Sequence, residues 1–288
     1  MTKRVALVGS ERGLRVDPDL PLAAPALQEA GFAVDLVRWD DPAVDWAGHD
    51  LAVVRSCWDH AWRREEFLAW ADAVPLLRNP APVLRWNSDK THLRDLERCG
   101  LPVVPTVWDP TTADELPDAE EWVVKPSVSA GSRDTARWSG AGDALAHAGE
   151  LAAAGRTAMV QPYLSSVDDA GETALLFTGG RFSHAVRKGP LLARGEGVRQ
   201  DRDSRSDLRP VEATPEQREV AQAVLDAVPS LVPEAGPLLY ARIDLVAGAG
   251  GRPVLLELEL TEPSLFLPQA PPEALPRLAR AVGDAIAA

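Results

Sequence analysis

The chain has 288 residues, of which 45% are hydrophobic and 25% are charged, and it carries a formal net charge of −13. These values are ordinary for a folded globular protein, and the length leaves room for more than one domain. Proteins that bind the nucleic-acid backbone non-specifically need a basic surface, so the acidic balance argues against a nucleic-acid partner. A local basic pocket for a small anion remains compatible with it.

Cysteine usage and hydropathy indicate the expected setting. The two cysteines, Cys57 and Cys99, form neither a metal-binding spacing nor a disulfide framework, so we expect the reducing cytoplasm. The first ten residues, MTKRVALVGS, lack the apolar core and the cleavage site of a signal peptide. No stretch approaches the roughly 20 apolar residues that a spanning helix needs, so we expect no membrane partner.

Strands alternate with helices in the first third of the chain. Apolar runs predict the strands, and apolar positions at helical spacing predict the helices. This alternation predicts an open parallel sheet of the α/β class, in which ligands bind beyond the carboxyl ends of the strands. The predicted strands are 3–9, 33–37 and 51–55, and the predicted helices are 22–30 and 65–73.

The third of these strands ends in polar residues. Arg55 and Ser56 lie at its carboxyl end, where a parallel sheet binds its ligands, so both are candidate substrate-binding residues. A local ion pair between Arg55 and Asp59 is the structural alternative.

The rest of the chain mixes strands and helices. Residues 189–210 are charged, contain glycine and show no clear period, so we expect a mobile loop. Thr214 is the predicted N-cap of the helix that follows it. Two apolar strands around the turn 247–252 predict a hairpin. The predicted strands are 122–125, 157–161, 173–178, 182–188, 240–246 and 254–260, and the predicted helices are 90–99, 215–228 and 273 to the end.

Lys125 interrupts an apolar strand just before a loop of small residues. A lysine at a strand edge that reaches water is the structural alternative. The loop that follows includes Ser129 and Ser132, and its small side chains and exposed N–H groups can approach phosphate oxygens closely. The loop does not match the GxxxxGK[ST] phosphate-binding pattern.

Four charged residues fall on the two strands of the predicted hairpin. Arg242 and Asp244 share one face of the first strand, and Glu257 and Glu259 share one face of the second. If the strands pair, three carboxylates and one guanidinium converge, and such carboxylates suit Mg²⁺. The structural alternative is that Arg242 pairs with one carboxylate. That pairing would leave two acids without a partner, which favours the metal.

The charged residues also follow an order along the chain. Cations come first, at Lys90, Lys125 and the pair Arg187-Lys188, and the carboxylates come late. This order would serve a nucleoside triphosphate with its magnesium, because lysines contact phosphates and carboxylates hold the bridging ions.

These motifs resemble the ATP-grasp superfamily, in its glutathione-synthetase-like branch. WVVKPSVSAGS resembles the strand lysine and the phosphate loop, VQPYL the adenine hinge, and YARIDLV and LELELTEPS the two metal strands. VRSCWD, LRWNSDK and ELELTEPSLFL resemble most closely the ligases that close the cycloserine ring from O-ureido-serine. The resemblance implies a parallel N-terminal substrate domain (1–86), followed by two α+β subdomains (87–165 and 166–288) that hold ATP between them.

The resemblance also implies residue roles. Arg242 and Lys125 would be catalytic, with Arg242 neutralising charge on the transferring phosphoryl group. Glu259 departs from the family, where asparagine is more common at this position. Two Mg²⁺ ions, with Mn²⁺ as an alternative, would bind Asp244, Glu257 and Glu259. ATP would contact Lys90, Lys125, Ser129, Ser132, Gln161, Leu164 and Glu172, with Glu172 at the ribose.

The implied activity is that of an ATP-dependent, ADP-forming carboxylate–amine ligase, which works through an acyl phosphate on a small amino acid or peptide-like substrate. Intramolecular cyclisation is one form of it, and homo-oligomers are common in this branch. The loops 127–132 and 189–210 are the expected lids. The alternatives are a small-molecule kinase and an ATP-binding regulatory or partner protein without turnover. The candidate substrate-binding residues are Arg55, Ser56, Arg187, Thr261, Glu262 (for an ammonium group) and Ser264.

Overall fold

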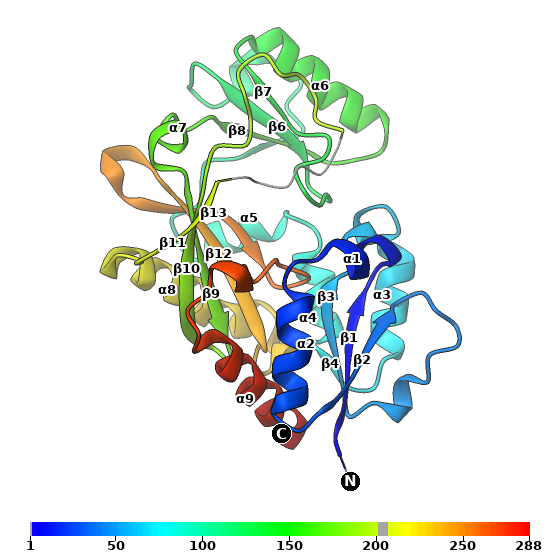
Figure 1. The fold of residues 1–288 in the computed structure, drawn as a ribbon. Helices are drawn as coiled ribbons and strands as arrows, with labels where there is room; N and C mark the ends of the chain where they lie inside the picture. The colour runs from blue at the N-terminus through cyan, green and yellow to red at the C-terminus, as the bar shows by residue number, and fades with distance from the viewer. Residues whose placement is uncertain (1, 201–206) are drawn as a thin grey trace.

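The computed structural model describes residues 2–200 and 207–288, which form three sheets with flanking helices (Figure 1). The predicted fold class is confirmed, because a parallel α/β region is followed by two α+β regions. Part of the predicted loop 189–210, residues 201–206, lies outside the described residues. In the described part of the chain, none of the helices is both long and apolar enough to span a lipid bilayer.

The N-terminal sheet is parallel throughout, in the order β2-β1-β3-β4. Its two central strands are almost entirely buried apolar runs, as expected for strands covered on both faces. The parallel sheet predicted from the alternation is therefore confirmed. Its elements are β1 (Arg4–Gly9), α1 (Glu11–Val16), α2 (Leu20–Glu29), β2 (Ala33–Arg38), β3 (Leu51–Ser56), α3 (Arg64–Ala73), β4 (Leu77–Arg78) and α4 (Ala81–Asn87).

A smaller antiparallel sheet has the order β5-β8-β6-β7. Helix α6 covers one face of it, where Ala144, Ala148 and Leu151 pack against Val124 and Val160. The small-residue loop leaves this sheet at the end of β6. The elements of this region are α5 (His92–Arg98), β5 (Val107–Trp108), β6 (Trp122–Pro126), β7 (Ala136–Trp138), α6 (Ala141–Ala153) and β8 (Ala158–Pro162).

The five-stranded sheet has the antiparallel order β11-β10-β9-β12-β13, and in Figure 1 it stands beside the N-terminal sheet, with the smaller sheet above. The predicted hairpin is confirmed as β12 and β13. The predicted cap is also confirmed, because the Thr214 hydroxyl accepts from Gln217 N at 3.2 Å. The elements here are α7 (Ser166–Ala170), β9 (Glu172–Thr178), β10 (Arg181–Lys188), β11 (Leu208–Val211), α8 (Pro215–Leu231), β12 (Tyr240–Ala247), β13 (Pro253–Glu259) and α9 (Ala274–Ala287).

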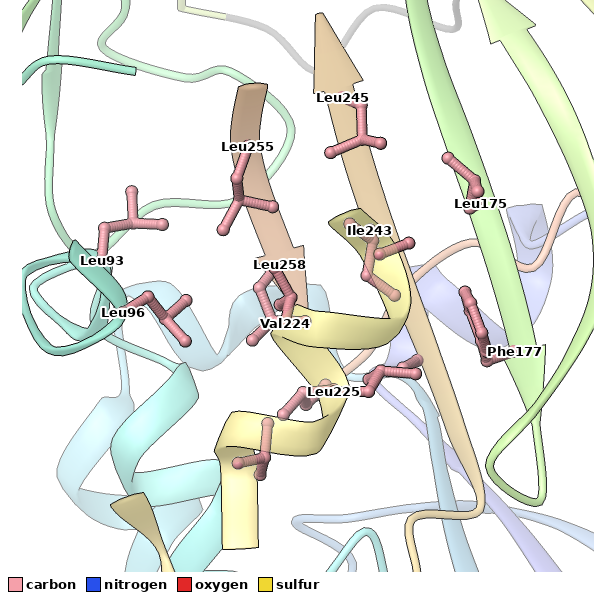
Figure 2. Packing of buried hydrophobic residues seen from close by; sticks show 14 of the residues in the cluster. Leu93, Leu96, Leu175, Phe177, Val224, Leu225, Ile243, Leu245, Leu255 and Leu258 are labelled. Atoms are coloured by element: carbon pink, nitrogen blue, oxygen red, sulfur yellow. The ribbon is translucent and has the colours of Figure 1, made fainter. Parts of the chain in front are cut away.

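One face of this sheet packs against α5 and α8. Ile243 of β12 points into that core, so period-two alternation turns Arg242 and Asp244 to the opposite face. Each fully buried Leu or Ile contributes about 1.5–3 kcal/mol, so the core holds the hairpin firmly in place. Figure 2 shows this packing, with Leu93, Leu96, Leu175, Phe177, Val224, Leu225, Ile243, Leu245, Leu255 and Leu258 labelled.

Two buried asparagines fasten the N-terminal region to the hairpin. Asn79 Nδ2 donates to the carbonyl oxygens of Tyr240 and Leu260 at 3.0 and 2.7 Å. Asn87 Nδ2 donates to Leu258 O at 2.8 Å, and its Oδ1 accepts from Leu260 N at 2.6 Å. These bonds satisfy backbone groups at the end of β13, so the segment that follows Glu257 and Glu259 has a fixed path.

Candidate active site

A cavity of about 740 Å³ opens where the three sheets meet, a size typical of sites for small ligands. Asp244 lies behind its wall and is fully buried. Most of the other predicted site residues line the cavity directly. These are Lys90, Lys125, Ser129, Ser132, Gln161, Leu164, Glu172, Arg242, Glu257, Glu259, Thr261, Glu262 and Ser264.

Three carboxylates and one guanidinium gather on one face of the hairpin, as the alternation predicted. In the antiparallel register Arg242 lies opposite Glu259, and Asp244 lies opposite Glu257. One carboxylate oxygen from each of the three acids lies within 4.8 Å of the others. The register shifts after Asp244, an irregularity of the kind that re-aims side chains next to active sites.

Two cations compensate the buried end of this cluster. Arg242 donates to Asp244 Oδ1 through Nε at 3.0 Å, and it also contacts Glu259. Lys188 contacts Asp244 and lies 2.6 Å from Glu172 Oε2. Since Asp244 is out of contact with water, its negative charge needs compensation, and Arg242 and Lys188 supply it.

The third carboxylate also has a cationic partner. Lys125 Nζ lies 3.1 Å from Glu257 Oε1. The expectation that pairing with Arg242 would leave two acids unpartnered was therefore wrong, because Lys125 and Lys188 reach the cluster from two other strands. The argument for a metal consequently rests on the geometry of the oxygen atoms and their position at the cavity, not on a lack of cations.

Burial and the cations act in opposite directions on the pKa values of these acids. For Asp244, burial raises the pKa, but Arg242 and Lys188 outweigh it and bring the pKa below the usual value. The pKa of Glu257 is also lowered, since nearby lysines outweigh burial. For Glu259, burial dominates and raises the pKa to about 7, although Arg242 opposes it. At neutral pH two acids are ionised, and the third is partly protonated.

The donor set fits a hard divalent cation, which prefers carboxylate oxygens. Glu257 and Glu259 line the cavity and keep 24% and 31% of their side-chain surface exposed, so an ion entering from the cavity can reach them. Lys125 and Arg242 are long enough to contact phosphate oxygens that accompany such an ion.

The small-residue loop after β6 forms another part of the wall. Lys90 Nζ donates to the carbonyl and hydroxyl oxygens of Ser129, both at 3.1 Å, which ties the loop to the start of α5. Gly131 and Ser132 adopt left-handed φ values of 65° and 59°, so the chain bends sharply there. The bend places small side chains and backbone at the cavity, as a phosphate loop requires.

The predicted hinge follows β8. Gln161 is buried, and its Nε2 donates to Thr106 Oγ1 at 2.9 Å, so its side chain is held inside the sheet. Tyr163 N donates to Glu121 O at 2.8 Å, and Leu164 lines the cavity one residue further on. The backbone on either side of Tyr163 therefore has a defined position against the cavity.

Arg55 and Ser56 have a structural role that the sequence did not predict. Arg55 is only 2% exposed, donates to Pro263 O at 2.8 Å and lies 3.4 Å from Asp19, with neither Arg55 nor Ser56 lining the cavity. Asp19 in turn accepts from the backbone N–H of Leu265 at 2.6 Å. The assignment of Arg55 and Ser56 to substrate is corrected: Arg55 holds the segment after β13 in place, and Ser56 is packed inside.

Arg187 also lies away from the cavity, and its neighbour Lys188 lines the cavity in its place. Arg187 donates to the carbonyl oxygens of Ala170 and Asp169 at 2.6 and 2.9 Å, and pairs with Asp207. Successive side chains of β10 point to opposite faces, so Lys188 faces the carboxylates and lines the cavity. Both residues belonged to the charged series predicted for the nucleotide, but the prediction selected Arg187 as the substrate contact, and the structure places Lys188 at the cavity instead.

The segment after β13 carries the remaining candidates. Thr261 is buried with its hydroxyl 3.2 Å from Asn87 Oδ1, and Ser264 O accepts from Arg242 Nη1 at 3.3 Å. Glu262 Oε1 lies 2.8 Å from His60 Nε2. No local signal in the sequence pointed to His60, because its partner lies 202 residues away in the chain.

Comparisons with known proteins give the class. A family model described as the N-terminal domain of D-cycloserine synthetase DcsG matches residues 5–79. The cycloserine biosynthesis protein DcsG of Streptomyces lavendulae is 38% identical over 302 residues, which cover 97% of this chain and 98% of that protein. The crystal structure of D-cycloserine synthetase DcsG superposes with a TM-score of 0.90 at 36% identity, covering 98% of this chain and 99% of that one.

The D-alanyl-alanine synthetase A of Vibrio cholerae shares the fold, with a TM-score of 0.68 at 13% identity over 99% of this chain and 98% of that one. The fold and the cavity thus define an ATP-grasp ligase, an enzyme that uses ATP with metal ions to form carbon–nitrogen bonds. Within this class, the chain belongs to the DcsG family.

Proposed function

We propose that the protein joins a carboxylate to an amine in two steps, through an acyl phosphate, with ADP as the nucleotide product. The observation that carries the proposal is the carboxylate cluster of the hairpin, which lies at one cavity in direct contact with lysines from two other strands. Phosphoryl transfer needs positioning and charge neutralisation more than a covalent catalyst, and this set of residues supplies both.

Asp244, Glu257 and Glu259 are the proposed ligands of two Mg²⁺ ions, for which Mn²⁺ could substitute. When bound, the ions would neutralise the phosphate charge and draw electrons from the phosphorus that is attacked. Around them, Lys90, Lys125 and Lys188 would bind the phosphates. The proposed contacts of the rest of ATP are Ser129 and Ser132 at the loop, Gln161 and Leu164 at adenine, and Glu172 at the ribose.

In the first step an oxygen of the substrate carboxylate forms a bond to the γ-phosphorus, and the bond to the β-phosphate oxygen breaks, releasing ADP. Arg242 lies at the cavity wall beside the carboxylate cluster and would neutralise charge on the group in transfer. In the second step the amine nitrogen bonds to the activated carbonyl carbon, phosphate leaves with its electron pair, and the nitrogen gives up one proton to the departing phosphate or to solvent. Leu191 and Leu192, from the described part of the loop 189–210, line the cavity and would exclude water.

A small amino-acid-like substrate suits the cavity, and O-ureido-serine is the first candidate because cycloserine synthetases are the relatives of this chain. With that substrate the nucleophile would be the oxygen-bound ureido nitrogen of the same molecule. Attack on the activated carbonyl would close the ring, and the carbamoyl group would leave as carbon dioxide and ammonia to give cycloserine. Thr261, Glu262 and Ser264 would contact it from the segment after β13. The domain division at 86/87 and 165/166, and assembly as a homo-oligomer, remain proposals.

The test is ADP release with ATP and Mg²⁺ across a panel of amino acids, O-ureido-D-serine and amine acceptors, with products identified by mass spectrometry. A ligase gives ADP only with a substrate. An intermolecular product has lost one water between carboxylate and amine, whereas cycloserine formed from O-ureido-D-serine is lighter by carbon dioxide and ammonia. A stable product that is heavier by one phosphate would instead identify a kinase. ATP binding with no turnover across the panel would count against the proposed function.

The matched variant for this assay is Glu257→Gln. It keeps the shape of the side chain, which is partly exposed, but removes one proposed ion ligand. It should bind Mg²⁺ more weakly and lose ADP formation. Wild-type turnover in this variant would contradict the metal assignment.

A further inference from the structure

A histidine and a glutamate from opposite ends of the chain meet at the N-terminal side of the cavity. His60 follows β3, Glu262 follows β13, and both line the cavity. His60 Nε2 lies 2.8 Å from Glu262 Oε1, and the imidazole is only 2% exposed. A hydrogen bond to an ionised group is among the stronger ones, so this contact fixes where the carboxylate points.

The imidazole has little freedom of its own. Its ring packs on the buried ring of Phe67, with the centroids 5.3 Å apart, which leaves Nε2 directed at Glu262. His60 Nδ1 is buried without a hydrogen-bond partner among the described residues. The bond to Glu262 is therefore the polar contact that orients this side chain.

The backbone around Glu262 is also held. Tyr240 Oη lies 2.9 Å from Thr261 O, Arg55 donates to Pro263 O at 2.8 Å, and Trp58 Nε1 lies 3.4 Å from Glu262 O. With the main chain fixed at three successive residues, the carboxylate is the part of Glu262 whose direction depends on His60.

The place of Glu262 in the cavity suggests what it binds. Two residues further on, Ser264 O accepts from Arg242, which stands at the carboxylate cluster. A substrate whose carboxylate is activated near Arg242 would have the neighbouring part of its skeleton along residues 262–264. In an α-amino acid that neighbouring group is an ammonium ion, which a carboxylate binds well and a hydrophobic wall would reject.

We propose that Glu262, held in place by His60, is the subsite that selects substrates with an α-ammonium group, and that His60 is its positioning residue. The proposal rests on the proposed function, because it assumes that the cavity takes an amino acid. It adds His60, a residue of the N-terminal region, to the groups that determine substrate specificity.

The experiment compares two ligands that differ only in the amine, O-ureido-D-serine and 3-(ureidooxy)propanoate. Calorimetry with Mg²⁺ and a non-hydrolysable ATP analogue gives a dissociation constant for each ligand. The dissociation constant of 3-(ureidooxy)propanoate divided by that of O-ureido-D-serine is the selectivity ratio for the amine. His60→Leu should lower this ratio about tenfold, a change of about 1.4 kcal/mol, by weakening the amino acid and not the analogue. Glu262→Gln should lower it at least as much.

The double variant makes the role of His60 specific. If His60 acts through Glu262, His60→Leu should have little further effect on the ratio in the Glu262→Gln background. His60→Gln, whose amide can still donate to Glu262, should retain most of the selectivity, and it serves if His60→Leu folds poorly. If His60→Leu acted only by disturbing the fold, a hydrogen-bond donor at position 60, as in His60→Gln, would not restore the selectivity.

His184 offers a matched control, since it is buried and its Nε2 lies 2.9 Å from Leu265 O in the same segment, but it does not line the cavity. His184→Gln should leave the ratio unchanged. Equal weakening of both ligands by His60→Leu, no weakening, or full additivity with Glu262→Gln would overturn the inference. ADP release distinguishes failure of this inference from failure of the proposed function. If the wild type turns over O-ureido-D-serine but His60→Leu leaves the ratio unaffected, the inference alone is overturned. A wild-type protein that binds neither ligand contradicts both the inference and the proposed function.

Discussion

Replacing Asp244 by Asn tests how the charge cluster is balanced before any ligand binds. Asp244 is fully buried, and its oxygens face Arg242 and Lys188. Breaking a buried ion pair costs about 3–5 kcal/mol, because it leaves an uncompensated charge. Lys188 keeps Glu172 at 2.6 Å, and Arg242 keeps Glu259, so we expect the lower end of that range, about 3 kcal/mol.

Thermal and urea unfolding measure this loss. At 2–4 °C per kcal/mol for a domain of comparable size, the melting temperature should fall by about 6–12 °C. The double variant Asp244→Asn/Lys188→Met should regain part of the stability, because it removes a buried charge that has lost one of its two carboxylate partners. Wild-type stability in Asp244→Asn, or further destabilisation by Lys188→Met in that background, would refute this reasoning. Activity of Asp244→Asn should be compared with wild type at a temperature where unfolding measurements show that the variant is folded.

Two further predictions concern neighbouring groups. Lys188→Met should lower kcat/KM for ATP by at least about tenfold, which is about 1.4 kcal/mol. Arg187→Met, on the opposite face of β10, is the control and should stay close to wild type in the same ADP assay. Equal losses in the two variants would contradict the assignment of Lys188 to the site. Glu259 has a pKa raised from 4.5 to about 7, so between these values the native state holds a proton that the unfolded chain has lost. The stability of the wild type relative to Glu259→Gln should therefore fall as the pH rises through that window and level off above it, in urea titrations from acid to neutral pH. A difference independent of pH would show that Glu259 does not titrate there.

The local features of the site could be predicted from the sequence. The period of two residues along 240–246 and 254–260, with a short Gly-rich turn between them, was enough to place Arg242, Asp244, Glu257 and Glu259 on one face. Helix α6 was not among the predicted elements, since alanines and two glycines give its apolar stripe little contrast.

Long-range contacts were beyond such reasoning. Arg55 ends a strand in the way that ligand-binding residues often do, and its structural partners, Asp19 and Pro263, lie 36 and 208 residues away in the chain. Lys125 meets Glu257 across 132 residues, a pairing that no periodicity contains. The choice between Arg187 and Lys188 depended on which face of β10 meets the cavity, and that is decided by the packing of the whole sheet.

The central claim is that phosphoryl transfer from ATP activates a carboxylate for attack by an amine. Transfer of oxygen-18 from the substrate to phosphate tests it most directly. With both carboxylate oxygens of O-ureido-D-serine labelled and unlabelled ATP, each phosphate released should carry one labelled oxygen, and the other label should remain in the product carbonyl. Turnover that releases phosphate without label, or that leaves the label in a stable phosphorylated product, would contradict the account.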